Sequence, residues 1–209
     1  MLGWWFWKDK GGKEVRAATS MNYCGLDETW QTLQAFIDEN GPFDGVLGFS
    51  QGAALAALLC SAQSPLAGTF KFAILCAGFL PRDPVYERWL APDGGRPLPT
   101  LPTMHIMGTL DERVPLAASE RLASCFAFAQ RFTWDGGHAV PSGAEFRHAV
   151  KAFLERATPS GATEPAPQTP PAAQHQKEKP HVRDPALVAD PSTLRVVEEY
   201  GQWRAIRGL

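Results

Sequence analysis

The sequence predicts an α/β fold in which helices cover both faces of a largely parallel sheet. Short apolar segments alternate with amphipathic ones between residues 27 and 156, a pattern typical of parallel strands that are buried on both sides. A serine flanked by glycines lies at one strand-to-helix junction. With 209 residues, of which 44% are hydrophobic, the chain can build one domain with a sizeable core.

The elements follow from periodicity and from helix-ending residues. Residues 27–40 predict a helix, because Asp27 can cap its start, Trp30 and Leu33 share one face, and an Asn-Gly-Pro sequence ends it at residues 40–42. Residues 79–101 are rich in Pro, Gly and Arg and predict an excursion from the sheet. The remaining predicted strands are 45–47, 70–77, 103–107 and 130–134, and the remaining predicted helices are 53–62, 116–126 and 144–156.

The composition changes at Thr158 and divides the chain into three parts. Residues 1–157 form the expected α/β domain. Residues 158–190 are dominated by Pro, Ala, Gln, Thr and charged residues, with little to bury, and predict a disordered linker. Residues 191–209 form a short tail, for which we weigh a helix against a disordered end. The tail gives no signal for a particular partner.

Charge and composition exclude several classes of protein. The formal net charge is -2 and the pI about 6.2, so no basic surface indicates nucleic acid or an anionic membrane. No segment suits a membrane span or a signal peptide, and we expect a cytoplasmic protein without stable membrane insertion. The four cysteines form no C-x-x-C pair and are interpreted as reduced thiols.

The pentapeptide at residues 48–52, Gly-Phe-Ser-Gln-Gly, carries the strongest chemical signal. It follows a predicted strand and opens a predicted helix, which is the context of the nucleophile elbow of α/β-hydrolases. Side chains two positions from the serine would collide in so tight a turn, which explains Gly48 and Gly52. Ser50 is therefore the candidate nucleophile.

A serine needs a base to take its proton, and five histidines compete for that role. His138 follows the last predicted strand on a glycine-rich turn, at the sheet edge where the strand ends meet. His105 lies within a strand and His148 within a helix, while His175 and His181 belong to the expected linker. We therefore expect His138 to be the base.

The carboxylate that orients this base is expected to be Asp111. It follows the third predicted strand, and the chain order Ser50, Asp111, His138 is that of α/β-hydrolase triads. Asp83 follows the second strand and is the main rival, whereas Asp135 lies too close to His138 along the chain to orient it easily. No metal-ligand cluster or phosphate-binding loop is found, so no cofactor or metal is expected.

These motifs resemble the FSH family of serine hydrolases, which includes the ovarian-cancer-associated esterases. The likeness is closest in residues 41–56 (GPFDGVLGFSQGAALA) and continues in 77–79 (AGF), 105–115 (HIMGTLDERVP) and 136–141 (GGHAVP). The aromatic run at residues 4–6 is also similar to one that family members carry before the elbow. The similarity spans roughly residues 3–156.

The resemblance implies a small serine carboxylesterase without a cofactor, acting on small-molecule esters that are fatty-acyl in several members. Ser50, Asp111 and His138 would form its triad, and the backbone N–H of Gln51 would be one oxyanion-hole donor. Acyl-protein thioesterases and lysophospholipases share the elbow pattern and are the nearest alternative.

Family members also have a strand, a helix and a further strand before the aromatic run, and this chain starts at that run. We therefore expect an N-terminally truncated fold that lacks the second oxyanion-hole donor, with a catalytically impaired remnant as the alternative function. Residues 45–47 would then be an unpaired, aggregation-prone sheet edge. The tryptophans would be partly exposed, and a membrane anchor is an alternative for them.

Overall fold

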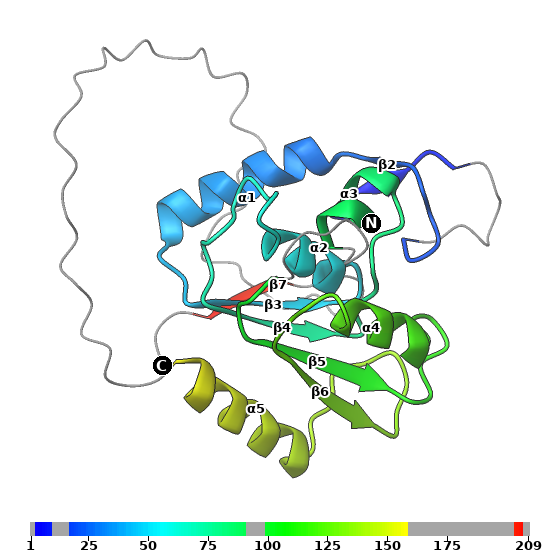
Figure 1. The fold of residues 1–209 in the computed structure, drawn as a ribbon, viewed down its shortest axis with the longest axis vertical. Helices are drawn as coiled ribbons and strands as arrows, with labels where there is room; N and C mark the ends of the chain where they lie inside the picture. The colour runs from blue at the N-terminus through cyan, green and yellow to red at the C-terminus, as the bar shows by residue number, and fades with distance from the viewer. Residues whose placement is uncertain (1–2, 10–16, 91–98, 159–202, 207–209) are drawn as a thin grey trace, which may run out of the picture. The chain divides into compact units, whose positions relative to one another are not determined.

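The computed structural model of the chain describes residues 3–9, 17–90, 99–158 and 203–206 (Figure 1). In chain order the elements of these residues are β1 (Phe6–Trp7), β2 (Tyr23–Cys24), α1 (Leu26–Asn40), β3 (Gly45–Phe49), α2 (Gln51–Leu59), β4 (Phe72–Cys76), α3 (Pro84–Leu90), β5 (Thr103–Gly108), α4 (Leu116–Ala123), β6 (Ala129–Trp134), α5 (Ala144–Ala157) and β7 (Trp203–Ile206).

The central sheet has the order β6-β5-β4-β3-β7. Strands β3 to β6 are parallel to one another, with Gly48 opposite Leu75 between β3 and β4, and Met104 opposite Gln130 between β5 and β6. Their C-terminal ends therefore meet at one edge, where α/β folds form their sites. The predicted α/β-hydrolase-type fold class is confirmed.

Helices cover both faces of this sheet because its strands are apolar on both sides. In β4, Ala73 and Leu75 belong to the core shared with α1, α2, α3 and α4, whereas Phe72 and Ile74 pack toward Phe153 of α5. Figure 1 shows α5 on the face opposite the other helices.

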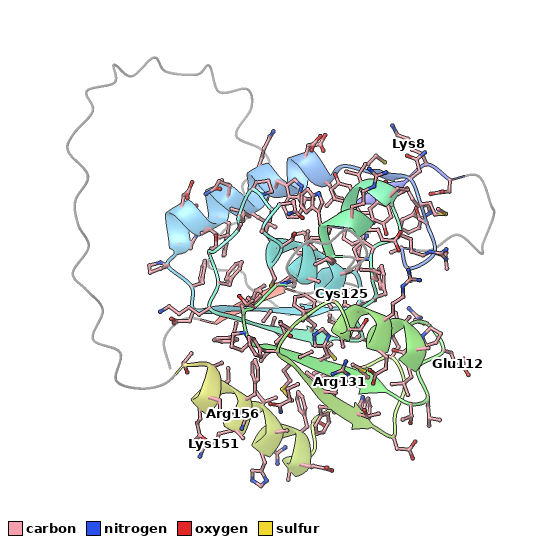
Figure 2. The ribbon with its side chains drawn as sticks, viewed as in Figure 1. Lys8, Glu112, Cys125, Arg131, Lys151 and Arg156 are labelled. Atoms are coloured by element: carbon pink, nitrogen blue, oxygen red, sulfur yellow. The ribbon has the colours of Figure 1, made fainter. Side chains whose placement is uncertain are left out.

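Helices α2 and α5 differ in how far their apolar residues extend around the helix axis. Helix α2 lies inside the larger core, with every residue from Gly52 to Leu59 buried, as expected for a helix that is apolar all round. Helix α5 is amphipathic: Phe153 is buried, while Lys151 points to solvent (Figure 2).

The predicted strands and helices of the hydrolase region are found with shifts of a few residues at their ends. The excursion between residues 79 and 101 contains one element that the sequence did not predict, helix α3. Asp83 begins it, since its side-chain Oδ1 accepts a hydrogen bond from the Val85 N–H at 3.0 Å. The expected linker at 158–190 lies outside the described residues, apart from Thr158.

The sheet edge beside β3 differs from the prediction. Strand β7 pairs antiparallel with β3 over four residues, from Gly45 opposite Ile206 to Gly48 opposite Trp203. The expectation of an unpaired edge at residues 45–47 is therefore wrong, because the C-terminal segment supplies a strand there. Within the tail at 191–209, the described residues 203–206 form a strand, so a helix at that position is also excluded.

The aromatic run near the N-terminus is not uniformly exposed. Trp5 is only 1% exposed and belongs to the larger core, with its ring centroid 5.0 Å from that of Tyr23. Trp4 is half-buried, whereas Phe6 and Trp7 in β1 are exposed. The prediction of partial exposure is therefore wrong for Trp5, because its indole packs into the core beside Tyr23 of β2.

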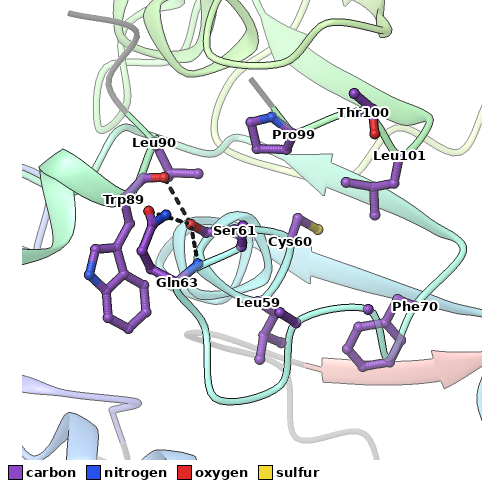
Figure 3. A pocket seen from close by; sticks show the side chains of 13 residues that line it. Leu59, Cys60, Ser61, Gln63, Phe70, Trp89, Leu90, Pro99, Thr100 and Leu101 are labelled. Carbon is purple, nitrogen blue, oxygen red and sulfur yellow. Dashed lines mark hydrogen bonds between the residues drawn. The ribbon is translucent and has the colours of Figure 1, made fainter. Parts of the chain in front are cut away.

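A cavity of about 670 Å³ opens at the far end of α2 (Figure 3). Its walls come from the residues after α2, from the end of α3 and from the segment before β5, including Cys60, Trp89 and Leu101. Ser61 donates a hydrogen bond to the Trp89 carbonyl at 2.8 Å in this wall. These residues lie at the N-terminal ends of the parallel strands, so the length of α2, about 13 Å, separates the cavity from the elbow.

Across the described ranges, no helix combines the length and the apolar character needed to span a membrane.

Candidate active site

Ser50 occupies the turn between β3 and α2 in a conformation that is rare for residues other than glycine. Its φ is 55° and its ψ -118°, a strained backbone geometry typical of functional turns. The turn is held because the Ser50 N–H donates to the Cys76 carbonyl at 2.9 Å, and the Ser50 carbonyl accepts from the N–H groups of Ala53 and Ala54. The hydroxyl therefore projects at the C-terminal edge of the sheet.

Gly48 is required by the close approach of β3 to α2. A Cβ atom at this position would lie 2.3 Å from the carbonyl oxygen of Gly52 and 2.6 Å from the nitrogen of Ala53. Both of these atoms are backbone and cannot rotate away, so a side chain would push the helix from the strand. The sequence-based explanation of Gly48 agrees with this geometry.

Asp111 lies in the loop after β5, with its side chain only 1% exposed. Its Oδ1 accepts hydrogen bonds from the N–H groups of Arg113 and Val114, each at 2.8 Å. These two bonds fix the plane of the carboxyl group and leave Oδ2 to face His138. The backbone hydrogen bonds of this turn thus orient the Asp111 side chain.

His138 bridges Asp111 and Ser50. Its Nδ1 lies 2.8 Å from Asp111 Oδ2, and its Nε2 lies 3.0 Å from Ser50 Oγ. Because a carboxylate only accepts, Nδ1 carries the proton and Nε2 is left as the acceptor for the serine hydroxyl. The structure therefore brings the three residues singled out from the sequence into one hydrogen-bonded chain.

Two neighbouring loops hold His138 at this place. Gly108 at the end of β5 lies so close to the next loop that a Cβ there would be 2.3 Å from the Gly136 carbonyl oxygen. The Leu110 N–H donates to that same oxygen at 3.0 Å. The loop that carries Asp111 is thus tied to the turn that carries His138.

Strands β3 and β4 add two further contacts to the imidazole turn. The Phe49 ring centroid lies 4.8 Å from that of His138, at an interplanar angle of 46°. The Cys76 thiol donates to the Ala139 carbonyl, with Sγ 3.7 Å from the oxygen. Burial, together with the charge of Asp111, raises the pKa of Cys76 to about 12. This thiol therefore stays protonated at neutral pH and does not compete with Ser50 as a nucleophile.

The rival histidines lie elsewhere. His105 is buried within β5, where its Nε2 lies 3.1 Å from Thr103 Oγ1. Burial is the main reason why its pKa falls to about 3, with a smaller contribution from the charge of Arg131. His148 is exposed on α5. His175 and His181 lie outside the described residues.

The rival carboxylates serve the fold around the site. Asp83 Oδ2 accepts from the Tyr23 N–H at 2.8 Å and so links the start of α3 to β2. Asp135 Oδ1 accepts from Thr109 Oγ1 at 3.1 Å. Neither group has His138 among the hydrogen-bond partners found in the described residues.

The start of α2 provides a donor for negative charge beside Ser50. The first N–H groups of a helix have no carbonyl partner inside it, and the helix dipole favours an anion there. Gln51 is the first residue of α2 and directly follows Ser50. Its N–H is therefore suited to bind an oxygen that becomes negative during attack by the serine.

Two exposed apolar side chains lie close in sequence to Asp111 and His138. Leu110, which precedes Asp111, is 63% exposed, and Val140, two residues after His138, is 47% exposed. Both side chains therefore expose hydrocarbon close in sequence to Asp111 and His138. In the described part of the chain, no three His, Cys, Asp or Glu side chains are grouped as metal ligands would be.

One contact at the elbow could not be predicted from the sequence. The Gln51 side chain accepts a hydrogen bond from the Trp4 N–H at 3.1 Å and donates one to the Trp5 carbonyl at 3.0 Å. The aromatic run was expected to be partly exposed, and its partner could not be predicted, because 46 or 47 residues separate the contacting groups along the chain.

Comparison with known proteins identifies relatives over this same region. The family model described as "Serine hydrolase (FSH1)" matches residues 1–150. Esterase OVCA2 of Mus musculus is 37% identical over 160 residues, covering 74% of this chain and 67% of its own length. The Homo sapiens protein of the same name is 38% identical over 158 residues, with the same coverage. Esterase C25G4.2 of Caenorhabditis elegans is 33% identical over 156 residues, covering 72% and 68%.

Solved structures share the fold at lower identity. Acyl-protein thioesterase 2 of Zea mays superposes with a TM-score of 0.54 at 18% identity, covering 74% of this chain and 72% of its own. Esterase PE8 gives a TM-score of 0.51 at 24% identity, with coverage of 74% and 70%. At these identities the likeness concerns the arrangement of strands and helices.

Proposed function

Because the chain belongs to the serine hydrolase (FSH1) family, we propose that it is a serine carboxylesterase in which Ser50, His138 and Asp111 carry the reaction. One observation supports this most: a continuous line of hydrogen bonds runs from the buried Asp111 through His138 to Ser50, with distances of 2.8 and 3.0 Å. This is the arrangement that turns a weakly nucleophilic hydroxyl into an attacking group.

In the first half of the reaction, Ser50 Oγ bonds to the carbonyl carbon of the ester while its proton passes to His138 Nε2. The carbonyl oxygen becomes an oxyanion, and Asp111 stabilises the imidazolium that forms without taking its proton. Collapse of the tetrahedral intermediate breaks the bond to the alcohol, which leaves with the proton from Nε2. The product is an acyl group on Ser50 and a free alcohol.

In the second half, water replaces the alcohol. His138 Nε2 takes one proton from the water as its oxygen attacks the acyl carbon, and then returns a proton to Ser50 Oγ as the acyl bond breaks. The carboxylic acid leaves, and the hydroxyl is restored. Every proton in the cycle passes through one imidazole nitrogen, so the tautomer set by Asp111 is essential.

The Gln51 N–H is the proposed donor to the oxyanion in both halves. Removing a single oxyanion-hole donor typically lowers kcat by about 10²–10³-fold. With this donor alone, acylation of Ser50 would be faster than hydrolysis of the ester by water without enzyme. It would be slower than acylation in an enzyme with two donors. The catalytically impaired alternative differs from the active esterase in the rate of this step.

The substrate class that fits the rim is an ester with an apolar acyl group. Leu110 and Val140, close in sequence to Asp111 and His138, expose hydrocarbon, and an acyl chain in contact with them would remove apolar area from water at about 25 cal/mol per Å². We therefore propose fatty-acyl esters. A thioester would use the same residues, so thioesterase activity is the competing substrate preference.

A fluorophosphonate probe tests the nucleophile. We expect one phosphonyl adduct on the peptide that contains Ser50, no adduct in Ser50→Ala, and normal labelling in the control Ser124→Ala, whose hydroxyl is exposed and bonded only within its own turn. Labelling that persists in Ser50→Ala would refute Ser50 as the nucleophile.

Turnover of matched substrates tests the class. We expect kcat/KM for p-nitrophenyl esters to rise from acetate to octanoate, and to exceed that for an S-octanoyl peptide. A labelled serine without measurable turnover of any ester would instead support the impaired remnant. Preference for the S-acyl peptide would support the thioesterase.

A further inference from the structure

Resting on the proposed function, we infer that the Gln51 side chain is a positioning residue: it holds the segment of Trp4 and Trp5 so that the half-buried Trp4 forms one wall of the acyl-binding surface, while Trp5 anchors the segment in the core. Gln51 already has a proposed role through its backbone N–H. Its side chain extends away from that group and joins the elbow to a segment almost fifty residues earlier.

The amide of Gln51 binds this segment as a neighbouring strand would. It accepts from the Trp4 N–H at 3.1 Å and donates to the Trp5 carbonyl at 3.0 Å. Both an acceptor and a donor are needed at the same time, and only Asn and Gln carry both in a neutral side chain of this shape. Gly3 adds to the fit, since a Cβ there would lie 3.4 Å from Gln51 Oε1 and 3.1 Å from the Trp5 carbonyl oxygen.

A second tie comes from α1. Thr29 Oγ1 donates to the Trp4 carbonyl and also contacts the Gly25 carbonyl at 3.1 Å. Thr29 is only 8% exposed, and Trp5 beside it is 1% exposed. The backbone of Trp4 is therefore held from both sides, by the elbow and by a helix that carries none of the proposed catalytic residues.

The hydrogen bonds from Gln51 and Thr29 together fix the position of the Trp4 backbone. The indole is half-buried against the larger core and keeps part of its surface open. Because its backbone is hydrogen-bonded to the residue that follows Ser50, we place that open surface beside the elbow. Aromatic rings offer a large, rigid apolar area for binding, so the segment is suited to contact the hydrocarbon of an acyl chain.

Releasing the segment should weaken binding of long acyl chains more than it slows the chemical step. Gln51→Met keeps the length of the side chain and removes both hydrogen bonds. Thr29→Val removes the other tie from a distance. Gln34→Met is the matched control, because Gln34 is exposed on α1 and its amide bonds only Asp38, at 2.7 Å.

The experiment compares KM and kcat for p-nitrophenyl octanoate and acetate in wild type, the three variants and the Gln51→Met/Thr29→Val double variant. We expect Gln51→Met and Thr29→Val each to raise the octanoate-to-acetate ratio of KM at least fivefold. The double variant should be no worse than the stronger single one, because both act through one segment. Gln34→Met should match wild type.

Failure of the proposed function and failure of this inference give different results. If wild type fails to label with fluorophosphonate at Ser50, the proposed function is wrong. If wild type labels but Thr29→Val leaves the KM ratio within twofold of wild type, the inference is overturned, whatever Gln51→Met does. A fall in kcat alone, equal for both esters, would also overturn it, because that points to a distorted elbow rather than a binding wall.

Discussion

Replacing Asp111 by Asn changes the group that orients the His138 imidazole and leaves the shape of the side chain unchanged. The amide has the same shape as the carboxyl group, but only one of its two terminal atoms accepts hydrogen bonds. The N–H groups of Arg113 and Val114 both donate to Oδ1 at 2.8 Å. These two donors force the amide oxygen to that side, so its NH₂ group must face His138.

The consequence is a reversed tautomer. With a donor opposite Nδ1, that nitrogen becomes the acceptor and Nε2 carries the proton, so it can no longer accept the proton of Ser50. The same change in a serine-protease triad lowers kcat by about 10⁴-fold. This corresponds to about 5 kcal/mol of lost transition-state stabilisation. The backbone bonds to the amide oxygen remain, and we expect Tm to change little.

Asp83→Asn is the matched control. Asp83 is also a buried aspartate after a strand, and it accepts from Tyr23 N–H and Val85 N–H on opposite oxygens. Its amide can satisfy only one of them, so we expect a loss of about 1–3 kcal/mol of stability with kcat/KM within threefold of wild type. The assay is kcat/KM for p-nitrophenyl butyrate together with thermal unfolding. A loss below tenfold in Asp111→Asn, or a larger loss in Asp83→Asn, would refute the assigned roles.

Three further predictions concern the fold around the site. Gly48→Ala places a Cβ 2.3 Å from a backbone carbonyl oxygen of α2, so we expect a loss of about 1–3 kcal/mol of stability and fluorophosphonate labelling at least 100-fold slower; labelling at the wild-type rate would contradict the close approach. The buried His105 has a pKa of about 3 in the folded protein and about 6.5 when unfolded. As the pH falls from 6.5 towards 3, the unfolded state binds the proton and the folded state does not, so the free energy of unfolding decreases. The expected decrease from pH 7 to pH 5 is about 2 kcal/mol. Urea unfolding should show a smaller loss in His105→Gln and an unchanged one in His148→Gln; equal slopes in all three proteins would contradict this. Proline at both Arg204 and Ala205 must remove a ladder hydrogen bond of β7, and light scattering should then detect association through the exposed β3 edge; a monomeric variant would contradict the protective role of β7.

Most of the sheet, Ser50 and His138 were predictable because each depends on local pattern. Ser50 is marked by two glycines that the turn requires, and His138 by its position just after a strand. Chain order could not separate Asp111 from Asp83, because both follow strands and both lie between Ser50 and His138; only the family resemblance favoured Asp111. The structure separates them by hydrogen bonding: one contacts the imidazole, and the other joins α3 to β2.

The features that the sequence did not reveal are long-range contacts. The pairing of β7 with β3 joins residues about 160 positions apart, and four residues carry no pattern that specifies their neighbour. The same holds for Gln51, whose side chain could equally have pointed into solvent. The burial of Trp5 likewise involves residues outside the aromatic run, Tyr23 and Gln51, which is why the tryptophans were expected to be partly exposed.

The most direct test of the account is to trap the acyl group during turnover. On mixing with excess p-nitrophenyl butyrate and quenching in acid, we expect a burst of one p-nitrophenolate per chain and a butyryl mass on the peptide that contains Ser50. Both signals should be lost in Ser50→Ala and strongly slowed in His138→Gln. A butyryl group on another residue, or full turnover by Ser50→Ala, would contradict the central claim that Ser50 is the nucleophile.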